Sequence, residues 1–237
     1  MNSPERTGQS TQNITDTQIT ESSHIVDRPS TTASLVVEAI GTFFLVLTIG
    51  CTVLTDQPLA PVAIGSVLMV MIFAGGHISG AHFNPAVTLA VTLRGRLRSN
   101  QLPMYWACQI IGGAAGALSA VALTRRHTGN PTVNITTAGI AAEFLFTLAL
   151  CWVVLNVATS RDHADNHFYG VAIGFTVLAG AVAVGSISGA AFNPAVALGV
   201  GIMGLIGWPA VLVWAVTQLA AGGVAAVLFR IANPHDR

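Results

Sequence analysis

Six long apolar segments alternate with short polar connections along the chain, at residues 33–54, 59–75, 102–123, 138–158, 168–184 and 208–231. Each is close to the ~20 residues that a helix needs to cross the hydrocarbon core of a bilayer. The first and the fourth segments contain one acidic residue each, Glu38 and Glu143. This pattern predicts an all-α polytopic membrane protein with six transmembrane helices.

A ten-residue sequence occurs twice in the chain. Residues 78–87 read ISGAHFNPAV and residues 187–196 read ISGAAFNPAV, so that only His82 and Ala191 differ. In each copy an asparagine, Asn84 or Asn193, precedes a proline, as expected of a helix N-cap followed by proline at the first helical position. The apolar runs that follow end near residues 93 and 202. Helices of that length rise about 14 Å, or half of the ~30 Å hydrocarbon core, which predicts two half-spanning helices.

The duplication extends beyond this motif. Gln109 follows Asn84, and Gln218 follows Asn193, by the same 25 residues. The chain therefore divides into repeat one, residues 33–124, and repeat two, residues 138–231, each with three spans and one half-helix. An odd number of full spans gives the two repeats opposite orientations. We therefore expect an inverted repeat whose two re-entrant half-helices enter from opposite faces and meet at the midplane.

Composition agrees with a membrane protein and narrows the possible functions. Of 237 residues, 52% are hydrophobic and 8% charged, the mean hydropathy is +0.67 and the formal net charge is zero, so nothing points to a nucleic-acid partner. The three cysteines lie in or at the ends of apolar runs without metal-binding spacing. No nucleophile, base and orienting residue stand in a recognisable order. We therefore predict no catalytic residues, no metal site and no cofactor.

The polar segments indicate how the chain sits in the membrane. Residues 1–32 are rich in Ser, Thr, Gln and Asn, which predicts a disordered tail. If this tail, the 94–98 and 161–167 connections and the C-terminal end of the chain, residues 232–237 together with Arg230 at the end of the last span, are cytoplasmic, that side holds eight of the ten arginines. The positive-inside rule then places both termini in the cytoplasm, and a plasma membrane is the default location.

Glycine- and serine-rich segments, residues 76–83 and 185–192, precede the two asparagines, and we expect them to be irregular chain within the membrane. Such backbone is tolerated at that depth only where it is buried in protein or lines a wet cavity. A water-filled path would then offer backbone carbonyl acceptors, with the side-chain amides of Asn84 and Asn193 as donors in the middle. Two helix N-termini pointing at one spot disfavour cations. The path therefore favours neutral hydrogen-bonding molecules.

Several paired features resemble the aquaporin and aquaglyceroporin (major intrinsic protein) superfamily over residues 33–231. They are the HISGAH sequence at residues 77–82 and the paired residues Asn84-Pro85-Ala86 and Asn193-Pro194-Ala195, Glu38 and Glu143, and Gln109 and Gln218. The resemblance implies a right-handed bundle of six helices with two re-entrant half-helices, one pore per subunit and a homotetramer in a lipid bilayer. It also implies that the two glutamates hold the irregular loops through backbone donors, and that His77, Gln109 and Gln218 help to support these loops.

One position departs from the family pattern. The residue two after the second motif proline is usually an arginine that narrows the outer pore, and here it is Val196. An ungapped comparison of the spans assigns the other three positions of this selectivity filter to Ile64, Ala181 and Ala190. All four side chains are apolar, so we expect a filter that is wider and poorer in hydrogen-bond donors than a water-selective one.

The leading hypothesis is a passive channel for water and for larger neutral solutes such as glycerol, urea, hydrogen peroxide, or arsenous or boric acid. A water-selective channel, narrowed by Ile64 or by phenylalanines, is the first alternative. A secondary transporter is also compatible with inverted repeats, but no acid is left near the midplane for ion coupling. A structural or adhesion protein that retains only the fold is a further alternative. His77 and His82 have poor spacing for a metal, and a hydrogen-bonding role fits them better.

Overall fold

The computed structural model describes residues 30–129 and 133–236. Six helices in these ranges are long and apolar enough to cross a membrane, which confirms the predicted fold class. Their bounds are α1 (Thr31–Val53), α2 (Ala60–Ser79), α4 (Leu102–Thr124), α5 (Thr137–Thr159), α6 (Tyr169–Ser188) and α8 (Trp208–Ala232). Two short helices follow the repeated asparagines, α3 (Pro85–Leu93) and α7 (Pro194–Ile202), and a single 3₁₀ turn, η1 (Arg161–His163), follows α5.

Two helices are longer than predicted. Helices α2 and α6 continue to Ser79 and Ser188, whereas the hydropathy pattern ended them near residues 75 and 184. The expectation that residues 76–83 and 185–192 are irregular is therefore wrong for the first four residues of each segment. Both helices end at a glycine in the left-handed region, Gly80 with φ 86° and Gly189 with φ 83°. Glycine adopts this conformation without steric cost, so these glycines, rather than the preceding ones, mark the helix ends.

The ends of the predicted membrane domain shift by one or two residues. Helix α1 begins at Thr31, inside the predicted tail, because the Ser30 hydroxyl accepts a hydrogen bond from the backbone N–H of Ala33 and caps the helix. Residues 1–29 of that predicted tail lie outside the described residues. Helix α8 extends to Ala232, one residue into the predicted C-terminal segment.

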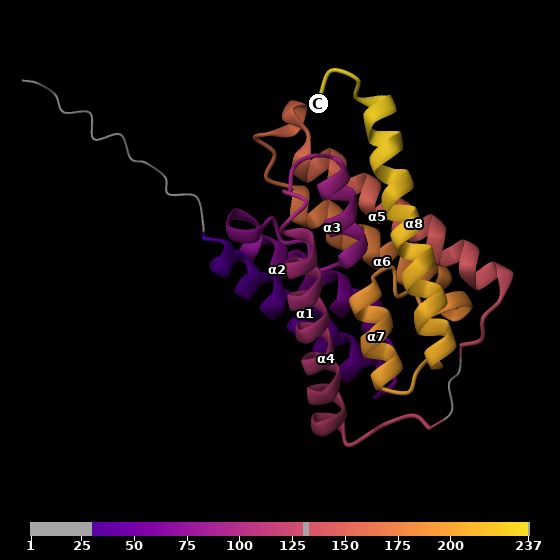
Figure 1. Ribbon diagram of the computed structural model, residues 1–237. Coiled ribbons are helices and arrows are strands. Elements are labelled where there is room, and N and C mark those ends of the chain that lie inside the picture. Colours follow the sequence, from indigo (N-terminus) through magenta and orange to yellow (C-terminus); the bar gives the residue numbers. More distant parts are fainter. Residues whose placement is uncertain (1–29, 130–132, 237) are drawn as a thin grey trace, which may run out of the picture.

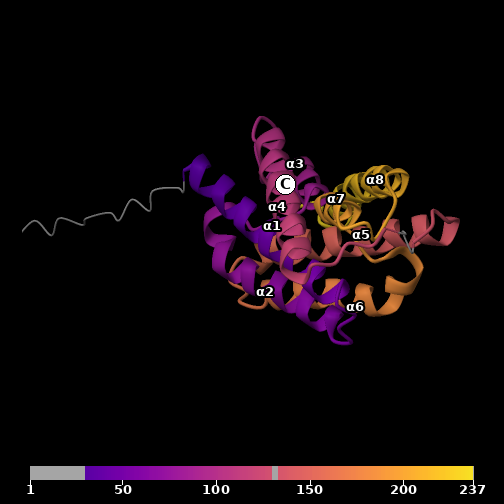
Figure 2. The same cartoon turned by 90° about the horizontal axis from the view of Figure 1, so that it is seen from below.

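The two repeats pack side by side in opposite orientations. Figure 2 shows α1, α2 and α4 on one side of the molecule and α5, α6 and α8 on the other. We call the side where α1 begins and α8 ends the terminal side, and the opposite side the far side. Helix α3 runs from the middle towards the terminal side, whereas α7 runs from the middle towards the far side, and the two lie one above the other in Figure 1.

Each half-helix packs against the other repeat as well as its own. Helix α3 contacts α8 and α5, and α7 contacts α4 and α1. Glycines allow the close approach: a Cβ atom on Gly222 would lie 2.6 Å from the carbonyl oxygen of Ala86, and one on Gly113 would lie 3.1 Å from that of Ala195. The exchange of half-helices brings both asparagines to the centre of the molecule.

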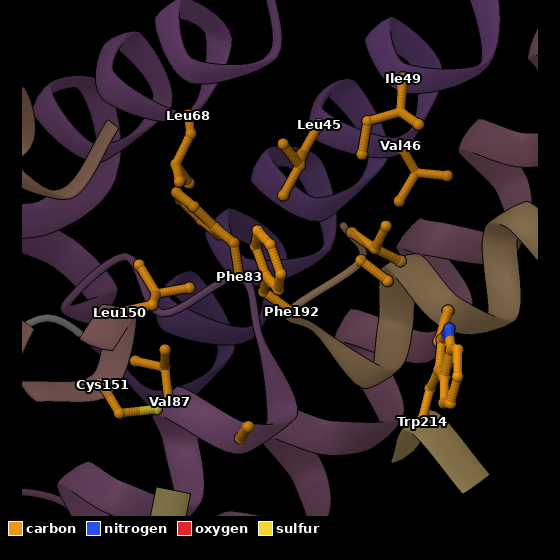
Figure 3. Packing of buried hydrophobic residues seen from close by; sticks show 14 of the residues in the cluster. Leu45, Val46, Ile49, Leu68, Phe83, Val87, Leu150, Cys151, Phe192 and Trp214 are labelled. Carbon is orange, nitrogen blue, oxygen red and sulfur yellow. The ribbon is translucent and has the colours of Figure 1, made fainter. Parts of the chain in front are cut away.

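Apolar side chains fill the middle of the bundle and also cover its outside. Figure 3 shows Phe83 and Phe192 in the middle of this packing, together with Leu45 of α1 and Leu68 of α2. Large apolar side chains are also exposed along the outer faces of the long helices, among them Val70, Ile111, Leu145, Val182 and Val216. An apolar exterior of this kind is what a bilayer requires.

A buried carboxylate ties the C-terminal segment to the bundle on the terminal side. One oxygen of Asp236 lies 2.6 Å from Nη2 of Arg94, and the carboxylate also pairs with Arg96 and Arg161. Burial by itself raises the pKa of Asp236, but hydrogen bonds from the Arg161 backbone and the Arg94 and Ser160 side chains outweigh it, so that the pKa lies below its ordinary value of 3.8. The charged carboxylate therefore stabilises the folded chain.

We predict that Asp236→Asn lowers the unfolding temperature at pH 7, by roughly 2–4 °C for each kcal/mol of stability lost. Because the pKa of Asp236 is lower in the folded than in the unfolded chain, the wild type has its full advantage in stability well above pH 3.8. This advantage is lost as the pH falls through the lower pKa of the folded chain. Thermal unfolding of both proteins in detergent, at a series of pH values, measures the difference. Equal unfolding temperatures at pH 7 would contradict the prediction.

Candidate functional site

Two five-residue loops, residues 80–84 and 189–193, lead into the half-helices with the same unusual backbone. Each loop has a glycine and two non-glycine residues in the left-handed region: Gly80, Ala81 and Phe83 with φ of 86°, 50° and 49°, and Gly189, Ala190 and Phe192 with φ of 83°, 51° and 49°. Non-glycine residues in this region cost about 1–3 kcal/mol each, so their surroundings must hold them there.

Glu38 holds the first loop. Its side chain is fully buried and accepts four hydrogen bonds. The donors are the backbone N–H groups of His82 (2.9 Å) and Phe83 (2.7 Å), the hydroxyl of Ser79 (2.7 Å) and Nε2 of Gln109 (2.8 Å). A buried carboxylate is stable only when its acceptor sites are used in this way.

Glu143 holds the second loop with the same arrangement. It is also fully buried and accepts hydrogen bonds from the backbone N–H groups of Ala191 (3.0 Å) and Phe192 (2.8 Å), the hydroxyl of Ser188 (2.7 Å) and Nε2 of Gln218 (2.7 Å). The two acids in the membrane-spanning helices therefore each bind an irregular loop, and all their contacts are with neutral donors.

Asn84 and Asn193 join the two loops at the centre. Each Oδ1 atom caps its half-helix by accepting a hydrogen bond from the backbone N–H two residues later, at 2.8 and 2.9 Å. Nδ2 of Asn84 donates to the carbonyl of Phe192 (2.9 Å), and Nδ2 of Asn193 donates to that of Phe83 (2.8 Å). An amide group carries two N–H donors, so one donor of each asparagine is used between the loops and one is left over.

A cavity of about 290 Å³ runs past both asparagines towards the far side. Along α2 its wall extends from Ala60 to Ile72, a rise of about 18 Å. The four residues assigned to a filter from the sequence all line this cavity: Ile64, Ala181, Ala190 and Val196. The rest of its side-chain wall is mainly aliphatic, contributed by α1, α2, α5, α6 and α7.

A second cavity, of about 750 Å³, opens on the terminal side. Polar side chains are frequent in its wall, among them Gln101, Tyr105, Arg161 and His163. His77 lies here, exposed, and has no side-chain hydrogen bond among the described residues. The expected role of His77 in supporting a loop is therefore not seen.

Two supporting residues were missed from the sequence. The hydroxyl of Tyr105 donates to the carbonyl of Ser79 (2.9 Å), and Nε1 of Trp214 donates to that of Ser188 (3.1 Å). Trp214 is fully buried. Trp214 follows Tyr105, and Ser188 follows Ser79, by 109 positions, which is also the spacing between Asn84 and Asn193. Aligning the repeats along their whole length would therefore have found both contacts.

The two repeats differ next to the asparagines. Nδ1 of His82 lies 3.3 Å from Oγ1 of Thr88. That hydroxyl donates its proton to the Asn84 carbonyl (2.9 Å) and accepts from Gln109 (2.8 Å), so Nδ1 of His82 must be the donor towards Thr88. The corresponding positions of repeat two hold Ala191 and Ala197, so this network exists in repeat one alone.

We predict that Glu38→Gln and Glu143→Gln both lower the unfolding temperature, because the new amide nitrogen faces other donors. In Glu143→Gln, the side-chain amide of Gln218 can rotate so that its Oε1, which otherwise has no partner, accepts a hydrogen bond from the new amide nitrogen. In Glu38→Gln, the amide of Gln109 can make the same rotation only by losing its hydrogen bond to Thr88. Glu38→Gln is therefore expected to cost about 1 kcal/mol more than Glu143→Gln. Thermal unfolding of the purified variants measures both losses, and the reverse order would contradict the assigned network.

Comparison with known proteins identifies the family. The family model described as major intrinsic protein matches residues 25–229. Aquaporin NIP1-3 from Oryza sativa subsp. japonica is 36% identical over 182 residues, which cover 71% of this chain and 63% of that protein. Nodulin-26 from Glycine max is 36% identical over 178 residues, which cover 70% of this chain and 65% of that protein. The matched segments thus span less than two thirds of these relatives.

The solved structures include the same fold. The X-ray structure of the aquaglyceroporin from Plasmodium falciparum matches with a TM-score of 0.73 at 20% identity, covering 86% of this chain and 98% of that one. The fold, the six apolar helices and the family model over most of the sequence agree. The chain is a multi-pass membrane protein that belongs to the major intrinsic protein family.

Proposed function

We propose that this chain is a passive channel for water and small neutral solutes, with the path running through the two cavities and past Asn84 and Asn193. The observation that carries the proposal is the meeting of two capped half-helices and their loops at one cavity wall. Members of this family are channels rather than enzymes.

The chemistry of the proposed path favours neutral molecules that form hydrogen bonds. The asparagines retain one amide donor each beside a mainly aliphatic wall. The N-termini of α3 and α7 both point to this region, and their partial positive charge opposes cations. A passive path also fits the two buried acids better than ion coupling does, since Glu38 and Glu143 use their acceptor sites to hold the loops.

We further propose that Ile64, Ala181, Ala190 and Val196 form the filter on the far side. None of these side chains can donate a hydrogen bond or carry a charge, and two of them are alanines. Such a filter would admit glycerol, urea, hydrogen peroxide or neutral metalloid acids such as arsenous and boric acid along with water. The matched aquaglyceroporin shares the fold of this chain at 20% identity.

We propose a homotetramer in a plasma membrane, with the terminal side in the cytoplasm. The orientation is supported by the arginines: Arg94, Arg96, Arg161 and Arg230 belong to the terminal side, whereas the far-side connection carries Arg125 and Arg126. An excess of arginine in cytoplasmic connections is the usual arrangement.

We predict that Val196→Arg lowers the permeability to glycerol and arsenous acid more than the permeability to water, roughly tenfold or more for glycerol. The long side chain would narrow the filter and add a fixed positive charge at a position that is 4% exposed and lines the cavity. Stopped-flow light scattering from liposomes that contain the purified protein measures each permeability.

Val196→Met is the matched control, because it adds length without charge or hydrogen-bond donors. If Val196→Arg reduces water and glycerol permeability by the same factor, or has no effect on either, Val196 is not part of a solute filter. If Val196→Arg lowers the glycerol permeability more than Val196→Met does, and the water permeability does not show this difference, the proposed filter is supported.

A further inference from the structure

The two cavities meet at a single ring of residues. Comparison of their walls shows five residues common to both: Ile72, Ala81, His82, Val154 and Ile173. The first cavity extends from this ring towards the far side, and the second opens from it on the terminal side. A solute that crosses the molecule along the proposed path must therefore pass this ring, which we call the throat.

Three separate helices and one loop build the throat. Ile72 comes from α2, Val154 from α5 and Ile173 from α6, and their exposed fractions are 2%, 7% and 5%. Ala81 and His82 come from the loop that Glu38 holds, so their positions depend on that buried carboxylate. The throat is thus made of tightly packed side chains and one rigidly held loop.

His82 is the only polar side chain of the throat. Its Nδ1–H is directed to Thr88, which leaves Nε2 as the atom that can exchange hydrogen bonds with a solute. Gly80 keeps the space beside Nε2 clear, since a Cβ atom there would lie 3.1 Å from it. The throat therefore offers one hydrogen-bonding nitrogen in an aliphatic ring.

The two constrictions of the proposed path differ in size and chemistry. The filter proposed on the far side contains two alanines, a valine and an isoleucine, whereas the throat contains two isoleucines, a valine, an alanine and an imidazole ring. The repeat-related counterpart of His82 is Ala191, so no second imidazole lies on the other loop. Bulky side chains narrow a path and force a solute to give up its hydration shell, and the throat has two isoleucines and an imidazole where the filter has one isoleucine and two alanines. The throat therefore presents the larger barrier.

We propose that the throat, rather than the filter around Val196, sets the upper limit of solute size and polarity in the wild-type chain. The inference rests on the proposed function, because it assigns selectivity within the same path. Solutes pass the open far-side filter and are sorted where they must leave most of their hydration shell between Ile72, Val154, Ile173 and the single nitrogen of His82.

Widening and narrowing the throat test this inference. Ile173→Ala should raise the ratio of glycerol to water permeability roughly threefold or more, because it removes three carbon atoms from the ring. Val154→Phe should lower the same ratio, because it fills the ring. Val177→Ala is the matched control: it lies one turn further along α6 and lines the first cavity alone, so its effect on the ratio should be smaller.

Stopped-flow light scattering with liposomes of equal protein content gives the ratio for each variant. A higher glycerol-to-water ratio in Ile173→Ala together with a lower ratio in Val154→Phe supports the selective role of the throat. Glycerol flux that appears only in Ile173→Ala also supports it. If the wild type conducts and neither variant changes the ratio, or if Val177→Ala changes it as much as Ile173→Ala, the inference is wrong while the channel function stands. If neither the wild type nor Ile173→Ala conducts water or any solute, both the proposed function and the inference fail.

Discussion

Two buried carboxylates hold the part of this protein on which the rest of the centre depends. The hydrogen bonds to Glu38 and Glu143 stabilise the strained left-handed conformation of Ala81, Phe83 and their counterparts in the second loop. The backbone carbonyls of Phe83 and Phe192 then accept hydrogen bonds from the side-chain amides of Asn193 and Asn84, and these two bonds join the repeats. Each acid thus fixes a loop, each loop places a half-helix, and the two half-helices define the cavity wall.

Much of the fold follows from the sequence because its signals are local and repeated. Hydropathy predicted six spans, and the asparagine-proline pairs predicted half-helices that begin and end where α3 and α7 do. Local patterns could not reveal how far α2 and α6 continue, because their last turns are rich in glycine and serine, residues that are common in both helices and loops within membranes. The bond from each asparagine to the opposite loop depends on contacts more than 100 residues apart.

The internal duplication produces similar loops but not equivalent ends. The glutamate networks and the caps recur almost atom for atom, whereas His82 and Thr88 have alanines as their counterparts. Substitution of side chains on a common frame therefore gives the far side an apolar opening and the terminal side a throat with one imidazole. The shared hydrogen-bond network holds the loops in both repeats, and we propose that the residues that differ between the repeats provide selectivity.

Stopped-flow light scattering from liposomes that contain the unmodified chain tests most directly the proposal that a mostly aliphatic path conducts neutral solutes larger than water. Water, urea, glycerol and arsenous acid gradients would be applied to the same preparation, beside liposomes without protein. We expect urea, glycerol and arsenous acid to enter these liposomes faster than they enter empty liposomes, at rates proportional to the gradient. Accelerated water movement with no acceleration of any larger solute would contradict it and would indicate a water-selective channel.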